Sequence, residues 1–468
     1  MKTQESKKVV IKSRQTVVPI EPTPRPRTHY LSNLDLLYSD IIINNVYYFP
    51  PFSNVNDSGE LIQGLKDSLA KVLVHYPVLA GRVRTGEDGR RYIDCSDEGI
   101  LLVEATADAR FDEWKDLINF PMEPYLNLGD SVITDFSTAP LLRIQVTLFG
   151  CGGVAIGYGF AHIVIDGWSA TEFMKAWSEV HRELPISINP TFATELLKAR
   201  SPPSVKQPVN DYLFFPKIPS DASSPAEAPS TATAPATKLA ITTFYFSADE
   251  VNALVQEVEN GPWAYDRPTS FEALEALCWK AMTEVRDLPD DVITTYSYPI
   301  NVRGRWDPAL PSGYFGNGPH LSCLGVKAGD IKHNHLSYVA KLIRDDIKAS
   351  GLEYLRSVID LLEIEMNQGK AVDFNSAFYA GTDVQGTNFA TFPIYEVDFG
   401  SGKPLHFSFY LHPLFGNGLA HVLPTPHGGR SRYVPMSMSE EHMKKLLENK
   451  LFTNFLAGAR HAKLVSFG

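Results

Sequence analysis

The chain has 468 residues and a formal net charge of −11 at pH 7, and 44% of its residues are hydrophobic. This is the composition of a globular protein, and the length favours two or more domains. The negative charge argues against nucleic acid as a partner, although local basic residues can still bind an anionic ligand. The four cysteines are scattered without a CxxC pair. They predict neither a disulfide scaffold nor a zinc site, and they fit a reducing compartment.

No segment is predicted to direct the chain into or across a membrane. The apolar run near the N-terminus, Val9–Ile11, is too short for the core of a secretory signal. The longest apolar stretch, Val154–Ile165, is too short to span a bilayer and contains Gly and His. We therefore expect a cytoplasmic protein without a membrane span.

The first half of the chain begins with an extended arm, residues 1–30, which is rich in proline and charge. Leucine and valine at helical spacing predict a helix over Glu60–His75. Ser169–Glu172 has the Ser-x-x-Glu pattern of a capping box and predicts the start of a second helix. Between these helices, strands are predicted at Arg90–Cys95, Leu101–Val103, Leu142–Phe149 and Val154–Phe160. The last two strands are joined by four turn residues and form a hairpin.

The clearest break in composition is Pro216–Lys238, which is rich in Pro, Ala, Ser and Thr. It cannot bury a core, so we predict a flexible crossover there. Ordered structure resumes with a strand at Leu239–Phe246 and a helix that opens with the capping box Thr269–Glu272. Further strand-like runs are Thr294–Ile300 and Phe392–Val397. The predicted organisation is α+β, with an N-terminal domain at 1–190, a crossover at 191–238 and a C-terminal domain at 239–468.

His162 is the first candidate for chemistry. It follows the second hairpin strand, lies in a loop before a helix, and is followed by Asp166 and Gly167. A lone histidine beside a core strand is more often structural, but this strand–loop–helix context favours a site. A hydroxyl has a pKa far above that of histidine, so the imidazole can accept its proton only as the oxygen attacks. Such general-base catalysis is typically worth ~10²–10⁴-fold.

Asp166 has two interpretations. It can orient the imidazole, as in a triad, or it can point away and pair with an arginine to hold the loop. We favour the structural role because only three residues separate it from His162 on a turning loop. Arg303 and Arg305 follow the strand at Thr294–Ile300, and each is a candidate either to pair with Asp166 or to contact a phosphate.

Several kinds of site have no signature in the chain. There is no nucleophile elbow, P-loop, GxGxxG, HExxH or cluster with metal-ligand spacing. We therefore expect no metal and no bound cofactor. The segment Glu396–Pro404 contains two glycines after Asp398, and taken alone it is explained as a turn.

Together these residues resemble the plant BAHD acyltransferases, which use acyl-coenzyme A. The run from His162 to Gly167 matches the H-x-x-x-D-G motif of that family. The run from Asp398 through Gly400 to Gly402 matches its D-F-G-W-G motif at every position but one. Three further stretches are similar to the family: residues 31–35, residues 76–82 and residues 314–317. The resemblance covers essentially the whole chain.

The resemblance implies two chloramphenicol-acetyltransferase-like domains, with mixed β-sheets flanked by helices, a long crossover and a channel between the domains. Acyl-CoA is then a co-substrate, the protein a monomer, and His162 the base inside the channel. The motif aspartate pairs with an arginine in this family, for which Arg303 is our candidate. The loop containing Asp398, Gly400 and Gly402 is chiefly structural and lies near the CoA end.

Two positions depart from the family pattern. Ser401 stands where the family usually has tryptophan, which predicts a looser loop. Relatives that act on shikimate or quinate carry an arginine shortly before D-F-G-W-G, and the alignment places Thr391 there. Threonine cannot form a bidentate ion pair with a carboxylate, so we predict a poor fit for these acceptors.

We therefore predict that the protein transfers an acyl group from CoA to an alcohol. The resemblance to the family implies that this acyl group is hydroxycinnamoyl. Asn45 and Tyr47 are candidate acceptor-pocket residues, and Thr269 and Ser270, at a helix N-terminus, are candidates to contact the phosphate or pantetheine of CoA. One alternative is N-acylation of a polyamine such as spermidine. Another is a non-catalytic relative that serves as an interaction protein in lipid elongation; the intact His162 disfavours it, whereas Ser401 keeps it open.

Overall fold

The structure is a computed structural model that describes residues 9–38, 41–52, 58–110, 123–128, 135–209, 238–369, 382–410, 416–456 and 465–467. The chain divides into two compact units. The first comprises residues 1–198, 302–319 and 391–412, and the second comprises residues 199–301, 320–390 and 413–468. The predicted crossover Pro216–Lys238 lies outside the described residues except for Lys238.

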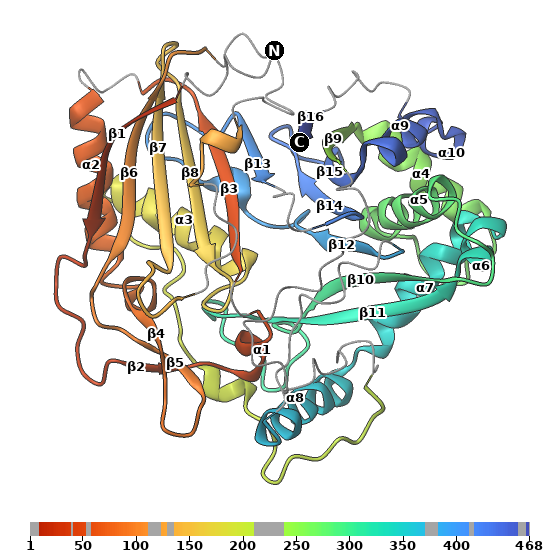
Figure 1. The fold of residues 1–468 in the computed structure, drawn as a ribbon, viewed down its shortest axis with the longest axis horizontal. Coiled ribbons are helices and arrows are strands. Elements are labelled where there is room, and N and C mark those ends of the chain that lie inside the picture. The colour runs from red at the N-terminus through yellow and green to blue at the C-terminus, as the bar shows by residue number, and fades with distance from the viewer. Residues whose placement is uncertain are drawn as a thin grey trace. The chain divides into compact units, whose positions relative to one another are not determined.

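The first unit contains a six-stranded mixed sheet in the order β1-β6-β7-β8-β3-β13 (Figure 1). The pair β6 and β7 is parallel, and the other neighbours are antiparallel. All eight residues of β8 are buried, which fits its place inside the sheet and its nearly continuous apolar sequence. The strands are β1 (Val9–Val17), β3 (Ile42–Phe49), β6 (Ile100–Ala107), β7 (Leu142–Phe149), β8 (Val154–Ala161) and β13 (His406–Tyr410).

Among its described residues, the first unit also contains a smaller sheet and three helices. The small sheet has the order β2-β5-β4, and the helices α2 and α3 pack against each other. Trp177 of α3 is fully buried and donates to Ser68 Oγ of α2 at 3.0 Å, which ties the two helices. These elements are β2 (Thr28–Tyr30), β4 (Arg82–Thr85), β5 (Arg91–Asp94), α1 (Asn33–Leu36), α2 (Ser58–Val72) and α3 (Gly167–His181). The described part of this unit also contains short 3-10 helices at Pro77–Ala80, Glu123–Tyr125, Thr194–Leu197 and Ile394–Glu396.

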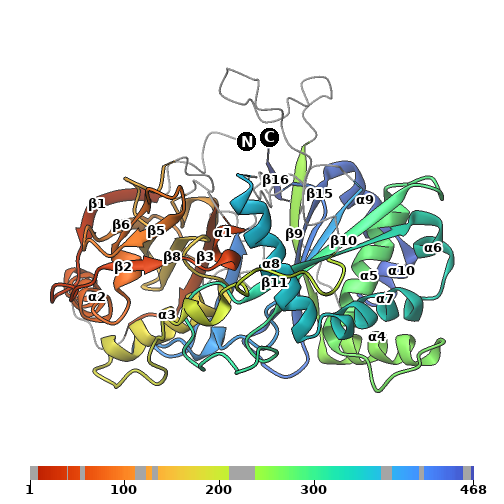
Figure 2. The ribbon, with the colours of Figure 1, turned by 90° about the horizontal axis from the view of Figure 1, so that it is seen from below.

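The second unit contains a seven-stranded mixed sheet in the order β11-β10-β12-β14-β15-β9-β16. Helix α5 lies among the other helices of this unit (Figure 2) and contacts α4, α6, α7, α9 and α10 as well as β12 and β14. Nearly all its residues are buried. The strands are β9 (Leu239–Phe246), β10 (Ile293–Asn301), β11 (Pro319–Lys327), β12 (Val384–Asn388), β14 (Leu419–Pro424), β15 (Arg432–Ser439) and β16 (Val465–Phe467). The helices are α4 (Ala248–Asn260), α5 (Ser270–Val285), α6 (Ala328–His333), α7 (Leu336–Ala349), α8 (Leu352–Asn367), α9 (Glu440–Glu448) and α10 (Lys450–Thr453).

The two units differ from the predicted division at residues 190 and 239 because later segments return to the first sheet and its loops. Strand β13 pairs with β3, although more than 350 residues separate them in the chain. The indole of Trp306 donates to the carbonyl of Leu196 at 2.8 Å. The D-F-G-x-G segment therefore belongs to the first unit, not to a C-terminal domain, because strand pairing rather than sequence order decides the membership.

Most predicted elements are present, with small differences at their ends. The two hairpin strands are β7 and β8, the strand predicted after the crossover is β9, and the capping box of Thr269 starts α5. The extended arm contributes β1 and β2 to the two sheets. The strand predicted at Phe392–Val397 is wrong. This segment contains the 3-10 helix Ile394–Glu396, and Pro393 at its N-cap has no N–H for a strand ladder.

Among the helices that the structure describes, none has both the length and the hydrophobicity needed to span a bilayer.

Candidate functional site

The site is built on the turn that follows β8. His162 donates its backbone N–H to the carbonyl of Ile41, and Val164 closes a turn onto the carbonyl of Ala161. The chain then enters α3, whose N-cap is Asp166 with φ −92° and ψ 178°. His162 therefore sits where the central strand ends and the helix has not yet begun.

The helix begins three residues before the predicted capping box. The Asp166 carboxylate accepts from Ser169 N at 2.9 Å, so Asp166 caps the helix and Ser169 lies in its first turn. Aspartate caps helices as well as serine does, and its charge suits the positive end of the helix dipole. The Ser169 hydroxyl is used elsewhere, donating to the carbonyl of Gly316 at 3.0 Å.

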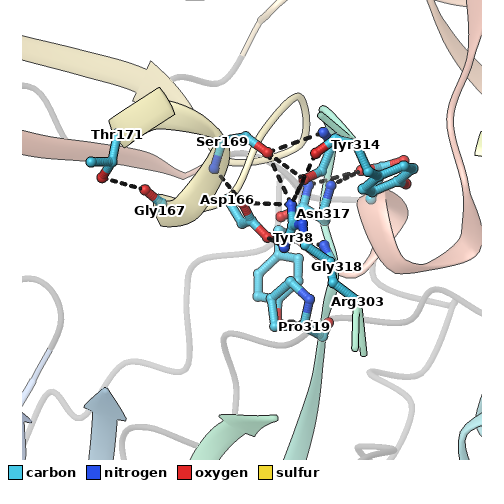
Figure 3. Close-up of polar contacts among 12 residues, drawn as sticks. Tyr38, Asp166, Gly167, Ser169, Thr171, Arg303, Tyr314, Asn317, Gly318 and Pro319 are labelled. Atoms are coloured by element: carbon cyan, nitrogen blue, oxygen red, sulfur yellow. Dashed lines mark hydrogen bonds and ion pairs between the residues drawn. The ribbon is translucent and has the colours of Figure 1, made fainter. Parts of the chain in front are cut away.

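Asp166 forms a bidentate ion pair with Arg303. The Nη1 and Nη2 atoms of Arg303 lie 2.6 and 3.1 Å from the two carboxylate oxygens (Figure 3). Both side chains are mostly buried, with exposed fractions of 11% for Arg303 and 6% for Asp166. The predicted pairing is therefore present, and in this geometry Asp166 holds the loop instead of contacting the imidazole.

The ion pair also fixes the backbone of residues 316–318. Arg303 Nη2 donates to the carbonyl of Gly316 at 3.0 Å, and Gly318 N donates to Asp166 Oδ2 at 3.0 Å. A Cβ atom at position 318 would lie 2.4 Å from Arg303 Nη1. Because that nitrogen is held by Asp166, it cannot move aside, so a glycine is required here.

Asn317 and Tyr38 surround the imidazole of His162. Asn317 Oδ1 lies 3.1 Å from His162 Nδ1, and Asn317 Nδ2 donates to the backbone carbonyl of His162 at 2.8 Å. The Tyr38 ring stacks on the imidazole with a centroid distance of 4.1 Å and an interplanar angle of 7°. The ring plane is thus fixed from one face and one edge.

Asp35 completes the polar cluster. Its Oδ1 atom accepts from the backbone N–H of Asn317 at 2.8 Å and from the side-chain amide of Asn317 at 2.9 Å. Its Oδ2 atom accepts from the N–H and the hydroxyl of Ser32, each at 2.7 Å, as part of the capping box of α1. Asp35 and Asn317 are both buried.

Burial and neighbouring charges set the protonation of the cluster. Burial lowers the pKa of His162 below its ordinary value of 6.5, although a hydrogen bond to the backbone of His162 itself, the charge of Asp166 and the hydrogen bond of Asn317 partly oppose this shift. Burial alone would raise the pKa of Asp166, but the charge and hydrogen bonds of Arg303 outweigh it, and the net pKa is lowered. Near neutral pH the site therefore holds a neutral imidazole beside an ionised Asp166.

The acceptor-pocket candidates Asn45 and Tyr47 lie in the interior of β3, with exposed fractions of 3% and 0%. Tyr47 packs against the rings of Tyr158 and Phe407, with centroid distances of 5.8 and 4.8 Å. Both side chains are part of the packing of the first sheet. A role in binding an acceptor remains a prediction.

The D-F-G-x-G loop has its own internal structure. Asp398 Oδ1 accepts from the N–H groups of Gly400 and Gly402, whose φ angles of +100° and +99° require glycine. Phe399 packs on Trp177 of α3 with a centroid distance of 4.7 Å. Ser401 Oγ is buried without a hydrogen-bond partner among the described residues, so the serine adds no polar contact in place of the family tryptophan.

The remaining candidates lie apart from this cluster in the chain. Thr269 is the N-cap of α5 in the second unit, where its hydroxyl accepts from Glu272 N at 3.2 Å, and Ser270 is the first residue of that helix. The Glu272 carboxylate already accepts from Thr269 N and from Arg344 at this helix end. Thr391 is exposed at the start of the segment 391–412 of the first unit.

The sequence predicted no role for Asn317 and Tyr38, which contact His162, or for Asp35, which contacts Asn317. Asp35 and Asn317 stood in stretches that resemble the family, and Tyr38 follows the first of them. The only local signal was the Ser-x-x-Asp pattern at residues 32–35, which predicts a helix cap. The contacts join residues that are 282 positions apart, which no local pattern shows.

No cluster of three or more His, Cys, Asp or Glu side chains suited to hold a metal ion occurs in the part of the chain that the structure describes.

Known proteins resemble this chain over nearly its full length. A model of the Transferase family matches residues 7–453. The chain is 33% identical to a hydroxycinnamoyltransferase from Narcissus pseudonarcissus, over 93% of this chain and 97% of the relative. It is 32% identical to shikimate O-hydroxycinnamoyltransferase from Nicotiana tabacum, over 96% and 99%. The crystal structure of vinorine synthase matches with a TM-score of 0.70 and 23% identity, covering 94% of this chain and 98% of that one, and shows the same fold.

We expect Asp166→Asn to destabilise the protein, because it leaves the buried guanidinium of Arg303 without its counter-charge. The free energy of unfolding should fall by about 3 kcal/mol. Thermal and denaturant unfolding followed by circular dichroism measure this. A variant that unfolds like the wild type but no longer transfers the acyl group would contradict the structural role of Asp166.

Proposed function

Because the chain belongs to the BAHD family of acyl-CoA-dependent acyltransferases, we propose that it transfers an acyl group to an alcohol with His162 as the general base. The observation that carries the proposal is the geometry of the imidazole. The ring is fixed by stacking on Tyr38 and is held through Nδ1 by Asn317, and it stays neutral near physiological pH. A neutral imidazole whose ring plane is fixed can accept a proton from a bound hydroxyl, as a general base must.

The proposed reaction proceeds in one ternary complex. As the hydroxyl oxygen of the acceptor bonds to the thioester carbon, Nε2 of His162 takes the hydroxyl proton. The tetrahedral intermediate then expels the CoA thiolate, and the imidazolium returns the proton to the thiolate sulfur. The products are an ester and free CoA, and His162 is neutral again. A thiolate leaves readily because its conjugate thiol has a low pKa, so no covalent enzyme intermediate is needed.

The donor we propose is a hydroxycinnamoyl-CoA. Support comes from the names of the relatives, a hydroxycinnamoyltransferase and a shikimate O-hydroxycinnamoyltransferase, at 33% and 32% identity. We also propose that Thr269 and Ser270 contact the CoA and that Asn45 and Tyr47 contact the acceptor, as in a chloramphenicol-acetyltransferase-like enzyme. The proposed acceptor is an alcohol, and the alternative is the amine of a polyamine. We propose that the protein is a monomer in the cytoplasm.

His162→Ala should remove the proton acceptor and leave acyl-CoA binding intact. We expect kcat to fall by at least about 10²-fold, with little change in KM for acyl-CoA. The measurement is release of free thiol from a panel of acyl-CoAs with mixed alcohols and amines. Wild-type rates in this variant would refute the mechanism. A wild-type protein that is silent across the whole panel would instead favour the non-catalytic interaction protein.

The pH profile should report the lowered pKa of His162. The neutral ring is the active form, so kcat/KM falls as the pH drops through this pKa. Because burial lowers the pKa below 6.5, the acidic limb should have its midpoint below pH 6.5. Steady-state rates measured from about pH 4.5 to 8 test this. A midpoint above the ordinary histidine value would show that the imidazole is not in the environment described here.

Shikimate should be a poor acceptor because Thr391 offers no cation for its carboxylate. We expect kcat/KM for shikimate to be at least about tenfold below that for an uncharged alcohol. The matched variant Thr391→Arg should reduce this difference, because it should raise kcat/KM for shikimate but not kcat/KM for the uncharged alcohol. Comparable turnover of both acceptors by the wild type would contradict the assignment of position 391.

A further inference from the structure

We infer that Asp35 is a positioning residue for His162, acting through Asn317 to keep the imidazole proton on Nδ1 and the lone pair of Nε2 available for the acceptor. This inference rests on the proposed function, because it explains how the general base is prepared. It concerns Asp35 and Asn317, to which neither the motif pattern nor the names of the relatives give a role.

The orientation of the Asn317 amide is fixed by two acceptors. Its nitrogen lies 2.9 Å from Asp35 Oδ1 and 2.8 Å from the backbone carbonyl of His162. Neither partner can donate a hydrogen bond, because one is a carboxylate oxygen and the other a carbonyl. Rotating the amide by half a turn would place its oxygen against both acceptors. The nitrogen must therefore face them, and the amide oxygen must face the imidazole.

The amide oxygen in turn selects the tautomer of His162. Asn317 Oδ1 lies 3.1 Å from Nδ1 and can only accept a hydrogen bond, so Nδ1 must carry the proton. In a neutral imidazole one nitrogen is a donor and the other an acceptor, which leaves the lone pair on Nε2. The stacked ring of Tyr38 holds the plane in which that lone pair points.

Asp35 is suited to this task because its carboxylate is saturated with donors. Four hydrogen bonds reach it, two from Ser32 at 2.7 Å each and two from Asn317 at 2.8 and 2.9 Å. Burial raises the pKa of Asp35 from its ordinary value, and these bonds oppose the rise. The hydrogen bonds from Ser32 and Asn317 favour the ionised form of the carboxylate, which is the form that accepts from the Asn317 amide.

The intervening amide separates the charge of Asp35 from the imidazole. Among the described residues, the charged or titratable side chains that act on the ring are Asp166, through its field, and Tyr38, which stacks on it. Asn317 is neutral, so it fixes the tautomer without the large increase in basicity that a direct carboxylate partner gives. Orientation and basicity are thereby set by different groups.

The first experiment observes the tautomer directly in the whole protein. With isotope-labelled histidine, nitrogen chemical shifts distinguish the Nδ1–H form from the Nε2–H form, and the His162→Ala spectrum identifies the signal of His162. The wild type should show the Nδ1–H form. A wild-type ring protonated on Nε2 would overturn the inference even if every variant failed to fold.

The second experiment removes each link and compares it with a matched control. Asn317→Ala should lower kcat by about 10²-fold and change KM for acyl-CoA by less than about twofold, as expected for a ring held in the wrong tautomer. Asp35→Ala should lower kcat by about tenfold and give a mixed tautomer signal. The control Ser32→Ala removes the hydroxyl contact of the Asp35 carboxylate and the side-chain cap of α1, but it keeps the backbone N–H of residue 32 and both bonds to Asn317. We therefore expect kcat to remain within about twofold of wild type.

The outcomes separate this inference from the proposed function. If Asn317→Ala keeps wild-type kcat and the Nδ1–H form while His162→Ala is inactive, the base stands and the positioning role fails. Equal losses in Ser32→Ala and Asp35→Ala would show that Asp35 acts only through the helix cap. Full activity of His162→Ala would refute the proposed function itself.

Discussion

The buried ion pair between Asp166 and Arg303 joins the loop after β8 to the segment 302–319, and the rest of the site depends on this junction. Burying two charges is costly unless their remaining hydrogen-bonding positions are also filled. Here Asp166 accepts from Ser169 N and Gly318 N as well, and Arg303 also donates to the carbonyl of Gly316. The same segment carries Asn317. The contact that fixes the helix start therefore also brings the amide to the imidazole.

The two buried carboxylates of the site have different tasks. Asp166 binds the guanidinium and the helix N-terminus, whereas Asp35 binds the amide that faces His162. In a Ser-His-Asp triad a single carboxylate both orients the imidazole and stabilises its charged form. Here a neutral amide stands next to the ring, and burial keeps the pKa of the ring low. A weaker base suffices when a thiolate is the leaving group and the proton moves as the hydroxyl attacks.

The contrast between Thr269 and Ser169 shows what a local pattern can predict. Both begin a possible capping box, and the box of Thr269 starts α5 as expected. The box of Ser169 does not start α3, because Asp166 caps the helix earlier and the Ser169 hydroxyl binds residues 147 and 134 positions away. Local rules hold where local groups have no competing partner, and they fail where a distant segment supplies one.

The same reasoning applies to the site and to the fold. The sequence predicted that His162 lies at the end of a hairpin strand, and it favoured an arginine partner for Asp166. Both predictions were possible because the hairpin strand and the motif from His162 to Gly167 are continuous in the chain. The sequence predicted neither Asn317 beside the imidazole nor β13 beside β3, because these contacts join segments that are 155 and more than 350 residues apart in the chain. The run at 392–397 was mistaken for a strand because its apolar residues outweighed Pro393.

The most direct test of the central claim is a crystal structure of the protein with a non-hydrolysable acyl-CoA analogue and an alcohol acceptor bound together. The account predicts that Nε2 of His162 lies about 3 Å from the acceptor oxygen while Nδ1 stays on Asn317 Oδ1. A complex in which both substrates are bound and the acceptor oxygen is nowhere near the imidazole, or contacts it only through Nδ1, would contradict it.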